Sequence, residues 1–316
     1  MESKLTIAIV QDSPVFNDLG ATLEKASRLA AEAAREGAQL IVFGETWFAG
    51  YPAWLDVCPE AALWDHPPTK KVFAQMYRNS VTVPGPACET LGALAKQHRL
   101  YLIAGVNESV VRGPGNGTLY NSILFFDPQG QLVNHHRKLM PTFTERLVHG
   151  PGDGAGLKAV DTPYGPIGGL ICWEHWMPLA RLAMHEAGEH IHFALWPKVH
   201  ELLQVASRSY AFEGRCFVVA VGQILAAADL PDGLALPPDL RADPSQLVLN
   251  GGSAVIGPDG RYRLEPRYDL RGLIYHTFDD LDSVLQERMT LDVTGHYQRP
   301  DLFTFSVDRR RSASEQ

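Results

Sequence analysis

The chain of 316 residues lacks any long hydrophobic run, and its N-terminal apolar run, residues 5–10, ends at Gln11 and Asp12. Because roughly 20 apolar residues are needed to span a bilayer, the sequence predicts no membrane association. The N-terminus also lacks the basic region, full apolar segment and cleavage site of a secretory signal, so we expect a cytoplasmic protein. A basic excess is missing as well: 28 Lys and Arg against 36 Asp and Glu give a net charge of −8. This balance argues against nucleic acid as a partner and favours a small molecule.

Cysteine is scarce, and no two cysteines form a CxxC pair. The sequence therefore predicts neither a disulfide framework nor a cysteine zinc site. A histidine zinc site is not indicated either, because His185 and His190 are five residues apart, whereas a zinc-binding helix needs a spacing of four. The four thiols have to be judged individually: Cys58, Cys88, Cys172 and Cys216.

With 45% hydrophobic and 20% charged residues, the chain has enough apolar surface to form a folded core. Short apolar runs at residues 6–10 and 40–43 are predicted strands, and the segment between them has the three- and four-residue spacing of an amphipathic helix. No linker separates two cores. The sequence therefore predicts a single α/β domain over residues 1–308 and a flexible C-terminal tail over residues 309–316.

The same alternation of strands and helices continues along the chain. Two proline-rich stretches, residues 52–68 and 226–246, lack periodicity and are predicted to be loops. Helices are predicted over residues 86–98, 178–187 and 202–214, and from 281. Further strands are predicted over residues 100–106, 120–126, 131–135, 167–171, 191–196, 216–221, 254–256, 262–264 and 273–277.

Three polar residues follow predicted strands: Glu45, Lys138 and Cys172. Open α/β sheets present ligand sites at such strand ends. A cysteine at a strand-to-helix corner near a cation is expected to have a lowered pKa and to act as a nucleophile. Lys138 would supply the cation and Glu45 a proton-transferring base. Structural roles remain open, because Cys172 also fits a small buried hydrophobe and the charged residues fit solvated loops.

Four sequence blocks carry a family resemblance. The chain reads FGETW at residues 43–47, HRKLMPTFTER at 136–146 and LICWEH at 170–175. These resemble, in the same order, the signature blocks of the nitrilase branch of the carbon-nitrogen hydrolases, and DVTGHYQRPD at 292–301 resembles a C-terminal stretch of that branch. The resemblance implies an αββα sandwich, in which two mixed sheets pack face to face with helices outside.

The resemblance also implies roles for individual residues. Glu45, Lys138 and Cys172 would form the catalytic triad, and Glu145 would be a second glutamate that supports the lysine and the substrate. Cys172 is expected to attack a nitrile carbon while Lys138 stabilises the nitrogen of the resulting thioimidate. Glu45 would transfer protons and activate water, which releases ammonia and then a carboxylic acid. This chemistry requires no metal ion and no organic cofactor.

Five residues in or beside these blocks are expected to line the pocket for a small nitrile substrate, although aromatic residues are also common core fillers. Many family members have asparagine directly after Cys-Trp-Glu, where this chain has histidine. Within the family that histidine is associated with arylacetonitrile and aliphatic substrates, which we therefore expect. The five residues are Tyr51, Trp54, Thr142, Trp173 and His175.

Several alternatives share the same motifs. An amidase or N-carbamoyl hydrolase would use the same triad on a planar amide, and a cyanide hydratase would release formamide. A catalytically silent scaffold would have lost a triad residue, whereas all three residues are present. The family builds dimers that often extend into spirals, so the resemblance also implies a homodimer or a larger homo-oligomer.

Overall fold

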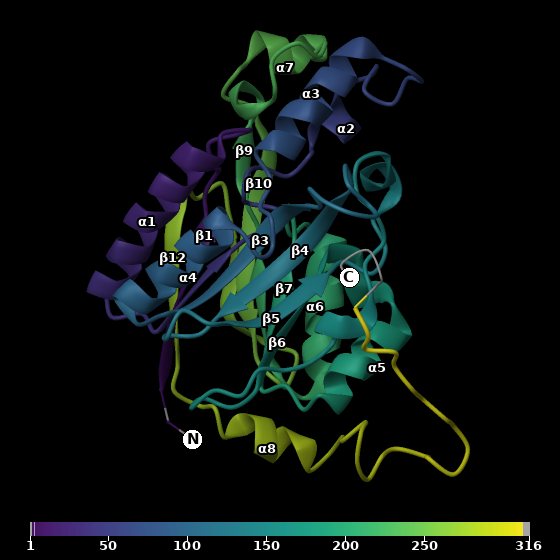
Figure 1. Cartoon of the computed structure of the whole chain (residues 1–316). Helices are drawn as coiled ribbons and strands as arrows, with labels where there is room; N and C mark the ends of the chain where they lie inside the picture. The colour runs from purple at the N-terminus through teal and green to yellow at the C-terminus, as the bar shows by residue number, and fades with distance from the viewer. Residues whose placement is uncertain (1, 3, 312–316) are drawn as a thin grey trace.

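The computed structural model describes residue 2 and residues 4–311, which form two β-sheets stacked face to face (Figure 1). The first sheet has the strand order β12–β1–β2–β3–β4–β5. It is mixed, because β1, β2 and β3 run parallel while β12, β4 and β5 are antiparallel to their neighbours. Its strands are β1 (Leu5–Gln11), β2 (Leu40–Phe43), β3 (Tyr101–Ser109), β4 (Leu119–Phe126), β5 (Leu132–Arg137) and β12 (Gly272–Phe278).

The second sheet has the strand order β11–β10–β8–β7–β6, and β9 pairs with β10 beside this path. It is also mixed, since β6, β7 and β8 run parallel and the pairs that include β10 are antiparallel. Its strands are β6 (Ile167–Ile171), β7 (Ile191–Leu195), β8 (Phe217–Val221), β9 (Ile224–Ala226), β10 (Leu247–Ile256) and β11 (Tyr262–Tyr268).

Helices cover the outer face of each sheet (Figure 1). α1 (Leu19–Arg35) and α4 (Pro86–His98) cover the first sheet, and α5 (Pro178–Glu186) and α6 (Glu201–Gly214) cover the second. The predicted αββα sandwich is confirmed. The other helices are α2 (Trp54–Val57), α3 (Pro67–Arg78), α7 (Pro238–Ala242) and α8 (Ser283–Arg288), with the 3-10 turns η1 (Phe143–Leu147), η2 (Gly154–Gly156), η3 (Cys172–Trp176) and η4 (Ala227–Asp229).

The central strands are buried on both faces. Along β1, Ile7 and Ile9 belong to the core that joins the two sheets with α5 and α6. Ala8 and Val10 point the other way, into the core beneath α1 and α4. A strand covered on both faces needs apolar residues at every position, which explains the continuous apolar runs in the sequence.

Both loop predictions were partly wrong, because they treated proline only as a breaker. α3 begins with Pro67 and Pro68 in its first turn, and α7 begins in the same way at Pro238. Proline fits the first turn of a helix, where its missing N–H would have no intrahelical partner. The resulting helices α2, α3 and α7 lie together at one end of the sandwich (Figure 1).

The C-terminal segment returns to the body of the domain. Arg309 donates to the carbonyl of Leu157 at 3.0 Å, and Arg311 donates to the carbonyl of His135 at 2.7 Å. These bonds hold the first residues of the predicted tail, whereas residues 312–316 lie outside the described part of the chain. Among the described residues, no helix has the length and apolar character needed to cross a membrane.

Candidate active site

The three predicted triad residues all lie at strand ends. Glu45 stands two residues beyond the end of β2, Lys138 directly follows β5, and Cys172 directly follows β6. Since β2 and β5 belong to the first sheet and β6 to the second, the site lies where the two sheets meet. All three side chains are buried.

The Lys138 ammonium joins two carboxylates. Its Nζ donates to Glu45 Oε1 at 2.9 Å and to Glu145 Oε1 and Oε2 at 2.9 and 2.7 Å. The Tyr51 hydroxyl donates to Glu145 Oε1 at 3.0 Å, and the Asn121 amide donates to Glu45 Oε1 at 2.7 Å. Within the described residues, Glu45 Oε2 has no hydrogen-bond partner. This oxygen is therefore available to accept a proton.

Cys172 opens η3 with a left-handed backbone, φ 52°. This conformation is unfavourable for a residue with a Cβ atom, and such strain is concentrated at functional sites. Cys172 Sγ and one carboxylate oxygen each from Glu45 and Glu145 lie within 4.8 Å of one another. Three such ligand atoms could hold a metal ion, but the Lys138 ammonium already binds both carboxylates. The structure thus brings the predicted cysteine, lysine and both glutamates into one cluster.

The two carboxylates of the cluster differ in acidity. Burial raises the pKa of Glu45 to about 7, with Lys138 opposing the rise and Glu145 adding to it. Burial also opposes ionisation of Glu145, but the charge and hydrogen bonds of Lys138 outweigh it and lower the pKa of Glu145. Near neutral pH, Glu145 is therefore ionised, whereas Glu45 can both release and accept a proton.

The expectation of a lowered pKa for Cys172 is wrong. Burial and the negative charge of Glu45 raise the pKa of Cys172 well above its usual value, and Lys138 opposes this rise without overcoming it. The helix that was expected to stabilise a thiolate, α5, begins only at Pro178, after η3. Helix-dipole effects fall off within one turn of the helix end. At rest Cys172 is therefore a thiol, which would need a base to act as a nucleophile.

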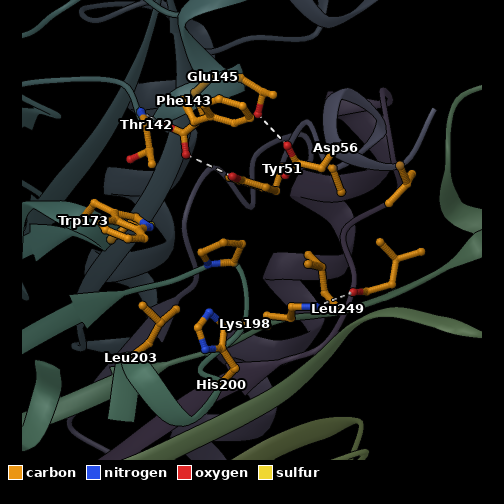
Figure 2. Close-up of a pocket in the computed structure, with 16 residues that line it drawn as sticks. Tyr51, Asp56, Thr142, Phe143, Glu145, Trp173, Lys198, His200, Leu203 and Leu249 are labelled. Carbon is orange, nitrogen blue, oxygen red and sulfur yellow. Dashed lines mark hydrogen bonds between the residues drawn. The ribbon is translucent and has the colours of Figure 1, made fainter. Parts of the chain in front are cut away.

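A cavity of about 560 Å³ opens onto Cys172. Figure 2 shows Thr142 and Glu145 at one end of this cavity, Trp173 at its side, and Lys198 and His200 toward the other end. Most of the remaining lining is apolar: Ala53, Val57, Phe143, Pro197, Leu203, Val248 and Leu249, with Tyr51, Asp56 and Thr144 adding polar groups. The structure thus places Tyr51, Thr142 and Trp173, three of the five predicted substrate contacts, in the cavity wall.

The two other predicted substrate contacts, Trp54 and His175, do not line this cavity. The Trp54 side chain is fully buried within an apolar cluster, while Asp56 from the same helix reaches the cavity. His175 lies on the inner side of Cys172. Its ring donates to the backbone carbonyl of Cys172 at 2.7 Å and stacks on Trp196 with centroids 4.7 Å apart.

Glu174 was not predicted as a site residue, yet it joins the ends of β5 and β6. Its carboxylate accepts hydrogen bonds from Leu139 N at 2.7 Å, Ile171 N at 2.6 Å and His136 Nε2 at 3.0 Å. Burial opposes ionisation, but His136 and the backbone donors outweigh it and lower the pKa of Glu174. This clamp fixes the strand that carries the lysine relative to the strand that carries the cysteine.

Two amides that hold Glu45 were also missed. Asn121 donates to Glu45 Oε1 at 2.7 Å, and Gln223 donates to the Glu45 backbone carbonyl at 2.6 Å. Both are buried polar residues: Asn121 lies within the apolar strand β4, and Gln223 lies between the apolar strands β8 and β9. A polar residue in such a place needs an internal partner, and this was the available sequence signal.

Fold and site together define the class of protein: a hydrolase built on two stacked mixed sheets. The family model for carbon-nitrogen hydrolases matches residues 6–284, and the chain belongs to this family. Its relatives also confirm the predicted membership of the nitrilase branch.

Named relatives match nearly the whole chain. The bifunctional nitrilase/nitrile hydratase NIT4B of Nicotiana tabacum is 37% identical over 309 residues, which cover 95% of this chain and 84% of that protein. An aliphatic nitrilase of Sinorhizobium fredii (strain HH103) is 38% identical over 307 residues, covering 97% and 96%. The crystal structure of Nit3 from Saccharomyces cerevisiae has a TM-score of 0.69 at 19% identity, covering 95% and 98%, and supports the fold.

Proposed function

We propose that the protein hydrolyses an organic nitrile to a carboxylic acid and ammonia, with Cys172 as the nucleophile. The observation that carries the proposal is the buried cluster of Glu45, Lys138 and Glu145 beside Cys172, at a cavity large enough for a small molecule. The named nitrilases at 37% and 38% identity support the same chemistry.

The first half of the reaction forms a covalent intermediate. The Cys172 thiol passes its proton to the free Oε2 of Glu45 as the sulfur attacks the nitrile carbon. One π bond of the nitrile becomes a lone pair on nitrogen, which the Lys138 ammonium stabilises. Protonation of that nitrogen by Glu45 gives a neutral thioimidate and restores the carboxylate.

The second half consumes two water molecules. Glu45 removes a proton from the first water as it adds to the thioimidate carbon, and the resulting tetrahedral carbon carries sulfur, oxygen and nitrogen. Glu45 returns that proton to nitrogen and then transfers the hydroxyl proton to it as well. Ammonia leaves as the C–N bond breaks and the C=O bond of a thioester on Cys172 forms. A second water, activated in the same way, releases the carboxylic acid and restores the thiol.

We infer that the substrates are arylacetonitriles or aliphatic nitriles. Valine and leucine side chains cover much of its wall, and Trp173 offers an aromatic face at the side (Figure 2). Pockets of this kind bind mainly through apolar contact, with a few polar groups fixing the orientation. Lys198 and Asp56 are the charged side chains in the wall outside the catalytic cluster.

Release of an amide is a second outcome to test, because a relative at 37% identity is named a bifunctional nitrilase/nitrile hydratase. The tetrahedral intermediate can break in two ways. Loss of ammonia leads to the acid, whereas loss of the Cys172 sulfur releases the amide directly. Which path dominates depends on which leaving group receives the proton from the glutamate.

Matched nitrile and amide pairs test the proposal. We expect ammonia and acid from arylacetonitriles or aliphatic nitriles, no turnover after Cys172→Ala, and full turnover after Cys88→Ala, which removes a buried thiol on α4. Circular dichroism and thermal melting check that both variants are folded. Turnover of amides but not nitriles would replace the proposal with an amidase, and turnover by a folded Cys172→Ala variant would refute the nucleophile.

We further propose that the chain forms a homodimer or larger homo-oligomer through the outer face of α5 and α6. Leu179 and Leu202 on these helices are 66% and 62% exposed, and Val205 and Phe212 extend the apolar surface. Light scattering after gel filtration should show an oligomer for the wild type and a smaller species after Leu179→Glu with Leu202→Glu. Val111→Glu, in a loop outside these helices, should leave the size unchanged; a monomeric wild type would refute this proposal.

A further inference from the structure

A continuous hydrogen-bond chain runs from the nucleophile into the interior of the second sheet. The Cys172 carbonyl bonds to His175 Nδ1 at 2.7 Å, and His175 Nε2 lies 2.9 Å from His192 Nε2. His192 Nδ1 lies 2.9 Å from Glu189 Oε1, and the Tyr210 hydroxyl donates to Glu189 Oε2 at 2.7 Å. The catalytic steps above do not use any of these interior side chains.

All four side chains of this hydrogen-bond chain are buried: His175, Glu189, His192 and Tyr210 are at most 2% exposed. Bulk water cannot replace a missing partner at such a depth, so each donor must face an acceptor within the protein. Burial and the neighbouring histidine lower the pKa of His175 to about 3, and burial with the charge of His185 lowers the pKa of His192 well below its usual value. Both imidazoles are therefore neutral.

Neutral imidazoles leave a single consistent placement of the protons. A carbonyl only accepts, so His175 donates from Nδ1 to Cys172 and its Nε2 must accept. His192 then donates from Nε2, and its Nδ1 must accept in turn. The remaining donor is the carboxyl proton of Glu189. Burial raises the pKa of Glu189 to about 8, which keeps this proton in place at neutral pH.

We propose that Glu189, His192 and His175 are positioning residues: through this hydrogen-bond chain they hold the Cys172 carbonyl, and with it the left-handed backbone of the nucleophile, in the reactive arrangement. The inference rests on the proposed role of Cys172 as the nucleophile. The strained φ of 52° needs support from its surroundings. The bond from His175 to the carbonyl of the same residue provides that support directly.

Loss of the Glu189 proton would reverse the chain. A carboxylate needs a donor, so His192 would carry its proton on Nδ1 and present a lone pair at Nε2. His175 would then donate from Nε2 and turn a lone pair toward the Cys172 carbonyl at 2.7 Å. The hydrogen bond that holds the nucleophile would become a repulsive contact. A single proton on Glu189 therefore controls a bond at Cys172, two side chains away.

Other titratable and charged groups surround Glu189 and its partners from each element packed against them. His185 and Arg181 face the hydrogen-bond chain from α5, and Tyr210 and Glu213 face it from α6. Cys216 faces it from the residue directly before β8. Arg288 donates to the Glu189 backbone carbonyl from α8. Glu174 and His136 face the two histidines from the clamp. The carboxyl itself is tightly enclosed, since a Cβ on Gly168 would lie 1.9 Å from Glu189 Oε1.

Glu189→Gln and Glu189→Met separate positioning from simple packing. The glutamine amide can donate to His192 and accept from Tyr210 at every pH, whereas methionine fills the space without a donor. We expect Glu189→Gln to keep most of kcat at pH 7 and Glu189→Met to lower kcat about ten- to a hundredfold with little change in KM. Ser207→Ala removes a buried hydrogen bond on α6 that is not part of the hydrogen-bond chain, and it should leave kcat unchanged.

The pH profile gives a readout that packing alone would not move. In the wild type, kcat should fall as pH rises through about 8, where Glu189 loses its proton, and in Glu189→Gln this fall should disappear. The rate of Cys172 alkylation by iodoacetamide, followed by mass spectrometry, should change in parallel. Because alkylation does not require nitrile turnover, it tests the positioning even if the proposed activity fails.

Three results would overturn the inference. A folded Glu189→Met variant with wild-type kcat would show that the chain does not position the nucleophile. A Glu189→Gln variant as slow as Glu189→Met would show that the glutamine donor does not replace the carboxyl proton. If Glu189→Met does not fold, Glu189→Gln decides alone: an alkaline fall near pH 8 that persists in this variant contradicts the proposal.

Discussion

The acid limb of the pH profile should belong to Glu45. The proposed base, Glu45, must be a carboxylate to act, and burial raises its pKa from 4.5 to about 7. The active form is therefore lost as pH falls through 7: about one molecule in ten keeps the carboxylate at pH 6, and about one in a hundred at pH 5. An ordinary glutamate would still be almost fully ionised at pH 6. We expect kcat/KM to fall about tenfold per pH unit below 7.

The assay measures ammonia release between pH 5 and 7.5 from a nitrile that has no titratable group. This range stays below the pKa of Glu189, which is about 8, and His149 does not interfere because burial lowers its pKa to about 4. Glu45→Gln should lower kcat about 10²–10⁴-fold. Glu145→Gln removes a negative charge that raises the pKa of Glu45, so the residual activity should show its acid limb at lower pH.

Several outcomes would refute this reasoning about Glu45. An acid limb near pH 4.5 in the wild type would mean that burial does not raise the pKa of Glu45. Substantial turnover by Glu45→Gln would exclude Glu45 as the base. A limb that stays in place after Glu145→Gln would show that the two carboxylates are not electrostatically coupled.

Two further predictions concern residues that support the site. Glu108→Gln should destabilise the fold by about 3–5 kcal/mol in urea unfolding at pH 7, because it breaks a buried pair with Arg137. Burial opposes ionisation of Glu108, but His135 and Arg137 lower its pKa to about 2. The stabilisation of the fold by the Glu108 carboxylate is therefore complete above pH 4.5 and is lost as pH falls toward 2. Equal stability of variant and wild type at pH 7 would contradict this. Gly105→Ala should lower both the melting temperature and kcat. A Cβ at this position would lie 2.0 Å from the Gly44 carbonyl oxygen, in the turn that carries Glu45. A variant with unchanged melting temperature and kcat would show that this turn can move freely.

Elements defined by local patterns were predictable from the sequence. Residues 40–43, 86–98 and 167–171 have the observed bounds of β2, α4 and β6, because apolar runs and helical spacing are properties of neighbouring residues. The order of strands in the two sheets could not be derived from periodicity, since it depends on contacts between residues far apart in sequence. It was expected only through the family resemblance.

The residues of the candidate site were predictable from the sequence to a similar extent. The motifs placed Glu45, Lys138, Glu145 and Cys172 at strand ends or nearby, and the structure brings them together. Which side of the nucleophile His175 faces could not be read from its place in the motif, because the direction of its ring depends on the turn of η3. The hydrogen-bond chain beyond it joins three separate elements, and no spacing in the sequence indicates it.

The charge state of the cluster follows from the number of carboxylates around one ammonium. Glu45 and Glu145 bring two negative charges to the single positive charge of Lys138, so a Cys172 thiolate would add a third negative charge in a buried site. The sequence-based expectation considered the cation near Cys172 but not the burial of the thiol, which is the larger cause, or the negative charge of Glu45, and this is why the predicted pKa of Cys172 had the wrong direction. A neutral thiol can attack only if its proton moves to Glu45 while the S–C bond forms. The new bond then removes the negative charge that sulfur would otherwise carry. The base and the electrophile must therefore be present together, which ties reactivity of the thiol to occupation of the cavity.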